Sequence, residues 1–100
     1  MISKVIVDPM DPRNLYIAVV GANVEITGIW KLTIGADDTQ TWVKLTDNAA
    51  NKIGRRIEVT DLDYTVDANG NLFLYAGVRN TGDAVGGVWR STDGGSNWFL

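Results

Sequence analysis

Two aspartates, Asp37 and Asp93, are the side chains of this sequence that best suit acid–base chemistry. A pair of carboxylates facing one bond performs glycoside hydrolysis, in which one group is the acid and the other the base or nucleophile. These two aspartates, however, occupy equivalent turns in two similar segments of the chain, so we expect them to lie apart rather than in one cleft. We therefore predict a structural role in the turn for each, and no catalytic residue.

The sequence contains no histidine and no cysteine, which excludes a Ser-His-Asp arrangement, a cysteine nucleophile, disulfides and the usual zinc ligands. Residues 67–71 carry oxygen ligands at alternate positions, as calcium loops do, but lack the downstream bidentate glutamate. A plain hairpin turn is therefore favoured there. Glu58, Asp61 and Asp63 could hold a metal, although alternation along a strand is favoured. We predict no metal and no cofactor.

The charge distribution argues against two classes of partner. The net charge is −3, and the basic residues are scattered except for Lys52, Arg55 and Arg56. A nucleic-acid or anionic-membrane surface is not expected. The small basic cluster could bind an anion, although a solvated turn is favoured. No apolar run approaches the roughly 20 residues of a membrane helix, and residues 1–8 lack the apolar core of a signal peptide.

The sequence contains an internal repeat in which a residue matches the residue 59 positions later. Aromatic residues define the register, since Tyr16 matches Tyr75 and Trp30 matches Trp89. The spacing then falls to 56, so that Asp37 matches Asp93 and Trp42 matches Trp98. We predict one unit over residues 1–100, with the first repeat at about 1–50 and the second at about 57–100. The recurring aromatic residues are predicted to pack in the core; the alternative is that the tryptophans form a sugar-stacking platform.

Each repeat contains short runs of aromatic and β-branched residues bounded by turn formers, which is typical of β-strands. No helical periodicity is present. Proline and Asn-Gly turns join the first and second runs, and the polar segment 46–54 is the expected crossing between repeats. The sequence therefore predicts an all-β protein with two four-stranded antiparallel sheets, whose strands are expected at residues 4–8, 15–20, 28–33, 42–45, 62–67, 72–78, 87–92 and 98–100.

A specific motif follows the third run of the second repeat. Ser91, Asp93, Gly95 and Trp98 match the Asp-box pattern Ser-x-Asp-x-Gly-x-x-Trp at every defined position, and residues 35–42 hold a degenerate copy that keeps Asp37 and Trp42. A carboxylate can accept amide hydrogen bonds within such a turn, glycine tolerates its left-handed backbone, and the tryptophan can then pack between sheets.

With this motif, and with related sequence at residues 7–16 and 87–90, the chain resembles the Asp-box propellers, also called bacterial neuraminidase repeat (BNR) propellers. It is most similar to the branch with the xyloglucanases, the sortilin-type receptors and a photosystem assembly factor. The resemblance implies four-stranded blades around an axis, a structural Asp-box away from any active site, and an extracellular or cell-surface location.

The catalytic residues of that family do not carry over. The xyloglucanase aspartate is expected after the second strand in a Thr-Asp-x-Gly-Gly context, where this sequence has Val20-Gly21 and Arg79-Asn80. The sialidases need an arginine triad and a Tyr/Glu pair spread over several blades. We therefore do not expect the chain to be an enzyme by itself.

Two blades cannot close a propeller of the usual 4 to 8, so further blades are expected as partners. These would come either from a longer chain, of which this is a fragment, or from association of copies, three giving six blades and four giving eight. The expected function is a non-catalytic module that binds a protein or a glycan. The alternatives are part of a glycoside hydrolase whose catalytic residues lie outside this chain, and a purely structural module of a large secreted or surface protein.

Overall fold

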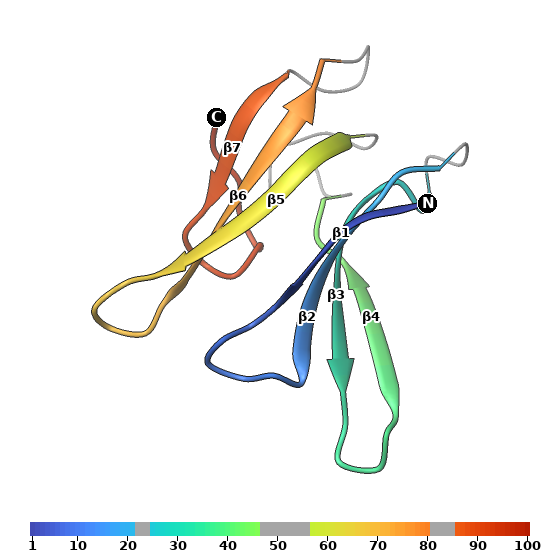
Figure 1. The fold of residues 1–100 in the computed structure, drawn as a ribbon, viewed down its shortest axis with the longest axis vertical. Helices are drawn as coiled ribbons and strands as arrows, with labels where there is room; N and C mark the ends of the chain where they lie inside the picture. Colours follow the sequence, from blue (N-terminus) through green and yellow to red (C-terminus); the bar gives the residue numbers. More distant parts are fainter. Residues whose placement is uncertain (22–24, 47–56, 81–85) are drawn as a thin grey trace.

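The computed structural model describes residues 1–21, 25–46, 57–80 and 86–100, and all regular structure within these ranges is β-strand (Figure 1). Within these ranges the strands form two antiparallel sheets, each with its strands in sequence order. The prediction of an all-β protein built from two antiparallel sheets is therefore confirmed. The first sheet consists of β1 (Ile2–Val7), β2 (Asn14–Val19), β3 (Gly28–Ile34) and β4 (Gln40–Lys44); the second consists of β5 (Glu58–Val66), β6 (Leu72–Arg79) and β7 (Gly87–Ser91).

The second sheet differs from the prediction in its strand count. Three strands form it within the described residues, and the expected fourth strand at 98–100 is reduced to a single antiparallel bridge between Arg90 and Phe99. The bridge has two backbone hydrogen bonds, of 2.7 and 2.8 Å. One isolated bridge is too short a ladder to count as a strand.

The hairpins that begin the two sheets are organised by equivalent aspartates. Asp8 accepts a hydrogen bond from the amide of Met10 at 2.9 Å, and Asp67 accepts hydrogen bonds from the amides of Asn69 and Asn71 at 2.9 and 2.8 Å. Gly70 has a φ of +82°, a conformation that glycine adopts without a steric penalty. Short side-chain acceptors of this kind favour turns, so the chain reverses at both sites.

The central ladders of the two sheets have the same register. Ile17 pairs with Trp30 between β2 and β3, and Ala76 pairs with Trp89 between β6 and β7. Every pair of the β6–β7 ladder is related in this way, by 59 residues, to a pair of the β2–β3 ladder. The first ladders of the two sheets differ in register by two residues. Ile6 lies opposite Tyr16, whereas Asp63, and not Thr65, lies opposite Tyr75.

The alternation of side chains along a strand gives each sheet two faces. We call the faces that meet each other inner and the remaining faces outer. Register and burial assign the residues as follows: first inner face, Ile6, Tyr16, Ala18 and Ile29; first outer face, Val5, Val7, Trp30 and Trp42; second inner face, Leu62, Leu74, Ala76 and Trp89; second outer face, Asp61, Asp63, Tyr75, Gly77 and Val88.

The core of the protein lies between the two inner faces. Strand β5 lies against β1, β2 and β3, and the two sheets diverge from this contact (Figure 1). The hydroxyl of Ser3 donates to the carbonyl oxygen of Val59 at 3.3 Å, and Lys4 forms an ion pair with Asp61 at 3.4 Å. Both contacts join β1 to β5. The exposed ion pair adds little to stability, so apolar burial between the faces holds the sheets together.

Candidate functional site

The turn from Ser91 to Trp98 is the most highly organised feature outside the sheets. The hydroxyl of Ser91, which is fully buried, donates to Oδ1 of Asp93 at 2.8 Å and accepts from the amide of Gly95 at 2.8 Å. Asp93 also accepts from the amide of Asn97 at 2.9 Å and from its side-chain nitrogen at 2.7 Å. Both carboxylate oxygens of Asp93 therefore bind donors that belong to the same turn.

The two glycines of this turn adopt conformations that other residues rarely take. Gly94 has a φ of +71° and Gly95 a φ of +99°. A Cβ atom at Gly95 would lie 2.5 Å from Cδ1 of Leu45, which belongs to the first sheet's segment, whereas at Gly94 the nearest atom would be the Tyr16 hydroxyl at 3.7 Å. Gly95 is therefore required both by its backbone and by the close approach of the other sheet.

Trp98 closes the turn and enters the core. Its indole nitrogen donates to the carbonyl oxygen of Gly95 at 2.9 Å, and its side chain is 1% exposed. A buried indole needs a partner for its one N–H donor, and the turn provides it. The four predicted Asp-box residues are thus brought together, and they join the turn to the packing between the sheets.

The electrostatics of Asp93 suit a structural carboxylate. Partial burial raises the pKa of this group, but the hydrogen bonds from Asn97 and Ser91 together outweigh burial and hold the pKa below its usual value. A general acid needs a pKa near the working pH, which requires a shift in the opposite direction. Asp93 therefore remains an ionised hydrogen-bond acceptor of its own turn.

The degenerate motif forms a simpler turn between β3 and β4. Asp37 accepts hydrogen bonds from the hydroxyl and the amide of Thr39, at 2.6 and 3.2 Å, and the hydroxyl contact is the main reason why its pKa is lowered. Asp38 has a positive φ of 63°. Asp37 and Asp93 lie in turns of different sheets, so the structure does not bring the two predicted turn carboxylates into one cleft.

The predicted core aromatic residues are divided between the faces. Tyr16 and Trp89 are buried between the sheets, and burial together with the nearby Asp8 carboxylate raises the pKa of the Tyr16 hydroxyl. Trp30 is half-buried on the first outer face, where its ring meets that of Trp42 edge to face with centroids 6.5 Å apart. Tyr75 is half-buried on the second outer face.

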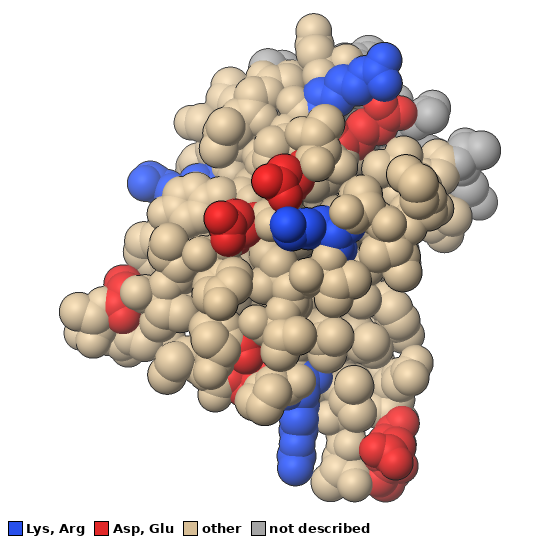
Figure 2. Space-filling model, in the orientation of Figure 1, with Lys and Arg blue, Asp and Glu red and all other residues tan. Residues whose placement is uncertain are grey.

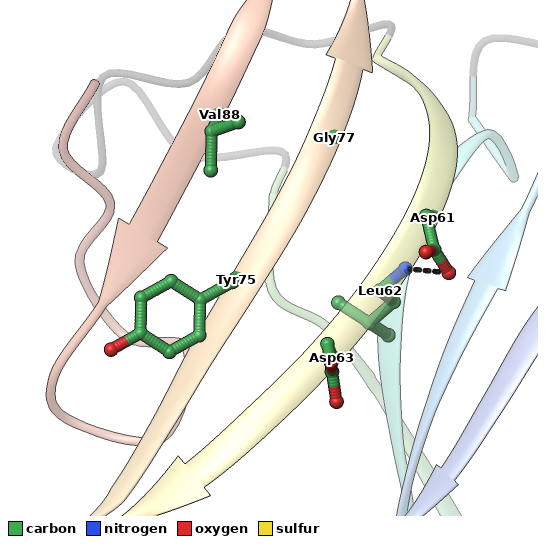
Figure 3. Close-up of a pocket in the computed structure, with 6 residues that line it drawn as sticks. All are labelled: Asp61, Leu62, Asp63, Tyr75, Gly77 and Val88. Atoms are coloured by element: carbon green, nitrogen blue, oxygen red, sulfur yellow. Dashed lines mark hydrogen bonds between the residues drawn. The ribbon is translucent and has the colours of Figure 1, made fainter.

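The sequence analysis missed a hollow of about 210 Å³ on the second outer face. Asp61, Leu62, Asp63, Tyr75, Gly77 and Val88 line it (Figure 3). Gly77 lies inside β6 at this hollow, and Oγ1 of Thr60 lies only 3.0 Å from the position that a Cβ atom of Gly77 would take. A glycine in a strand interior is a signal of close approach by another group, and it could have indicated this place. The amide of Leu62 and the ammonium of Lys4 lower the pKa of Asp61.

The remaining polar residues form no concentrated site in the part of the chain that the structure describes. No group of three or more acidic side chains is placed to hold a metal there. Asn69 and Asn71 donate to Asp67, and Figure 2 shows charges of both signs dispersed over the visible face. Lys52, Arg55 and Arg56, and all of the expected crossing at 46–54 except Thr46, lie outside the described residues. No described helix is long and apolar enough to span a membrane.

Comparisons with protein families, with curated proteins and with solved structures found no match for this chain. The likeness to the Asp-box propellers therefore depends on the motif residues and on the repeat. It stays a prediction, and the geometry of the two sheets is the observation from which a function must be argued.

Proposed function

We propose that the chain is a non-catalytic β-propeller repeat module of the Asp-box kind, in which each sheet is a blade and the loops bind a protein or a glycan. One observation carries the proposal. Ala18 faces the contact between the sheets, while Gly77, its equivalent at a spacing of 59, faces away from it. The two sheets are therefore stacked in the same sense, as successive blades are.

This arrangement differs from that of a symmetric sandwich. If the two repeats were related by a two-fold axis, equivalent faces would meet each other, as the same surface does in an isologous contact. Here the face with Tyr16 meets the face with Ala76, whereas the face with Tyr75 is open. The order of strands in each sheet, with every strand beside its sequence neighbour, also agrees with a blade.

The non-catalytic part of the proposal is supported by the carboxylates. Asp37 and Asp93 bind donors of their own turns, and both have lowered pKa values. Glycosidases need two carboxyl groups roughly 5 to 10 Å apart in one cleft, which requires both carboxyl groups to lie on one surface. These two lie on the turns of different sheets.

One hydrolysis assay and two binding assays test this function. The chain is incubated with xyloglucan and with sialosides, and separately applied to a glycan array and to a pull-down from extracts. We expect no release of sugar, together with binding of either a glycan or a protein. Hydrolysis by the purified chain would contradict the non-catalytic assignment. An experimental structure in which Ala18 and Gly77 both faced the contact between the sheets would contradict the blade assignment.

A further inference from the structure

The first outer face carries several exposed apolar side chains. Val5 and Val7 are each 47% exposed and Trp42 is 45% exposed, and these side chains extend from β1 at one edge of the sheet to β4 at the other. Trp30 lies between them, in edge contact with Trp42. A contiguous apolar face of this kind marks an interaction surface.

The second outer face also carries exposed apolar side chains, but it contains a hollow. Val88 and Phe99 are 64% and 49% exposed, and the hollow of about 210 Å³ lies over Gly77. A cavity of about 150 Å³ is enough for a benzene ring, so this hollow has room for an aromatic side chain. One open face therefore presents tryptophans, and the other presents a recess that is lined by Asp61 and Asp63 as well as by Tyr75 and Val88.

The contact inside the chain shows how two such faces pair. Its two inner faces are the repeat equivalents of the two outer faces: Trp98, buried between the sheets, corresponds to Trp42, and Ala18, buried in the same core, corresponds to Gly77. Each open face is thus the counterpart of a face that the other sheet covers within the chain. A sheet of the same kind as the two in this chain is therefore a surface that fits each open face.

We propose that the first outer face of one copy of this chain docks onto the second outer face of another copy. This inference rests on the blade-like stacking of the proposed function. The contact is heterologous, joining two different patches, and repetition of it closes a ring when the rotation allows. Two to four copies would bring together roughly four to eight sheets, the usual range for propellers.

The test begins with the mass in solution of the full chain, measured by light scattering over about a hundredfold range of concentration. The expected mass is a whole multiple of the monomer mass, decreasing on dilution. Trp42→Glu on one face, or Val88→Glu on the other, is expected to weaken association by about 30-fold or more, as charges in the centre of an interface do. A wild-type chain that stays monomeric throughout would overturn the proposal.

Val43→Glu is the matched control. Val43 adjoins Trp42 in β4 and is similarly exposed, at 50%, but its side chain points to the opposite side of the sheet. This variant is expected to associate like the wild type. If Val43→Glu weakened association as much as Trp42→Glu does, the assignment of the first outer face as the docking surface would be contradicted. Circular dichroism and urea midpoints confirm that each variant is folded before its mass is compared.

Mixing the two face variants separates a heterologous contact from a symmetric one. The Trp42→Glu chain keeps an intact second outer face and the Val88→Glu chain keeps an intact first outer face, so the mixture is expected to form a heterodimer limited to one copy of each. A mixture that remains monomeric would overturn the heterologous contact. Glycan or protein binding by a strictly monomeric chain would leave the proposed function in place and remove this inference alone.

Discussion

Trp42 and Trp98 occupy equivalent places at the ends of the two repeats, yet their surroundings differ. Trp98 is 1% exposed and Trp42 is 45% exposed. Each follows the turn of its Asp-box or degenerate Asp-box, and each lies on the same face of its sheet relative to the strand order. The difference arises because the first sheet covers Trp98, while the face that holds Trp42 is open. Burial in this fold is thus decided by the neighbouring sheet rather than by the local motif.

The turns before these tryptophans differ in the same way. Gly95 lies against Leu45 of the other repeat, whereas Thr39, its counterpart at a spacing of 56, lies on an exposed hairpin. A side chain is tolerated at Thr39 because nothing from another sheet approaches it there in the described structure. The complete motif is therefore found where two sheets meet, and the degenerate copy where only one sheet is present.

The largest effect is expected from truncating the two tryptophans. Trp98→Ala should lower the free energy of unfolding by about 3 to 5 kcal/mol, because it opens a cavity in the core and removes the indole hydrogen bond. Trp42→Ala should lower it by about 1 kcal/mol or less, since that ring is already half in water. Urea unfolding followed by circular dichroism measures both. Equal losses would show that the two tryptophans have equivalent surroundings after all.

A smaller effect is expected from adding a methyl group in the turn. Gly95→Ala should cost about 2 to 3 kcal/mol, from backbone strain and from collision with Leu45. Gly94→Ala, which brings backbone strain alone, is the control and should cost about 1 to 2 kcal/mol. Leu45→Ala combined with Gly95→Ala should show favourable coupling in a double-mutant cycle, because the collision disappears. Purely additive losses would contradict the close approach of the two repeats at this turn.

Ser91→Ala should have a moderate effect. The variant leaves the buried amide of Gly95 without its acceptor, which should lower the free energy of unfolding, measured by urea unfolding, by about 1 to 2 kcal/mol. Thr39→Ala, at the exposed turn of the first sheet, is the comparison and should cost less than about 0.5 kcal/mol. If the two losses were alike, the hydroxyl of Ser91 would not be organising the turn.

The smallest effect concerns pH. The pKa of Asp93 is lower in the folded protein than in the unfolded chain, so the stability that it contributes is present above the unfolded value of about 4 and is lost as the pH falls through the lowered folded value. In Asp93→Asn, stability should therefore decrease less steeply below about pH 4. Asp37→Asn should change the slope in the same direction, because hydrogen bonds from Thr39 also lower the pKa of Asp37. Urea midpoints at a series of acidic pH values provide the comparison.

Part of the candidate site could be predicted because it depends on contacts that are local in the chain. The Asp-box turn is formed by residues within seven positions of one another, and the hydrogen bonds of Ser91, Asp93 and Gly95 follow from that spacing. The hairpins at Asp8 and Asp67 are local in the same way. The fourth strand of the second sheet was predicted wrongly, because the match of Trp98 to Trp42 did not show how short the ladder beyond it would be.

The hollow over Gly77 and the separation of the tryptophans could not be predicted from spacing. Trp30 and Trp89 are related by an unbroken offset of 59, yet one lies on an outer face and the other on an inner face. A repeat gives equivalent residues equivalent places in their own sheets. It does not specify which face of a sheet another sheet will cover.

By itself, then, the sequence determined the β-strands, the antiparallel sheets and the turn chemistry of the Asp-box, because all of these follow from side-chain alternation and from hydrogen bonds between near neighbours in the chain. Only the tertiary structure decided which equivalent residues are buried and where the open apolar faces lie. The physical reason is that burial depends on the stacking of one sheet on the next, a contact between residues far apart in the chain, such as Ser3 and Val59.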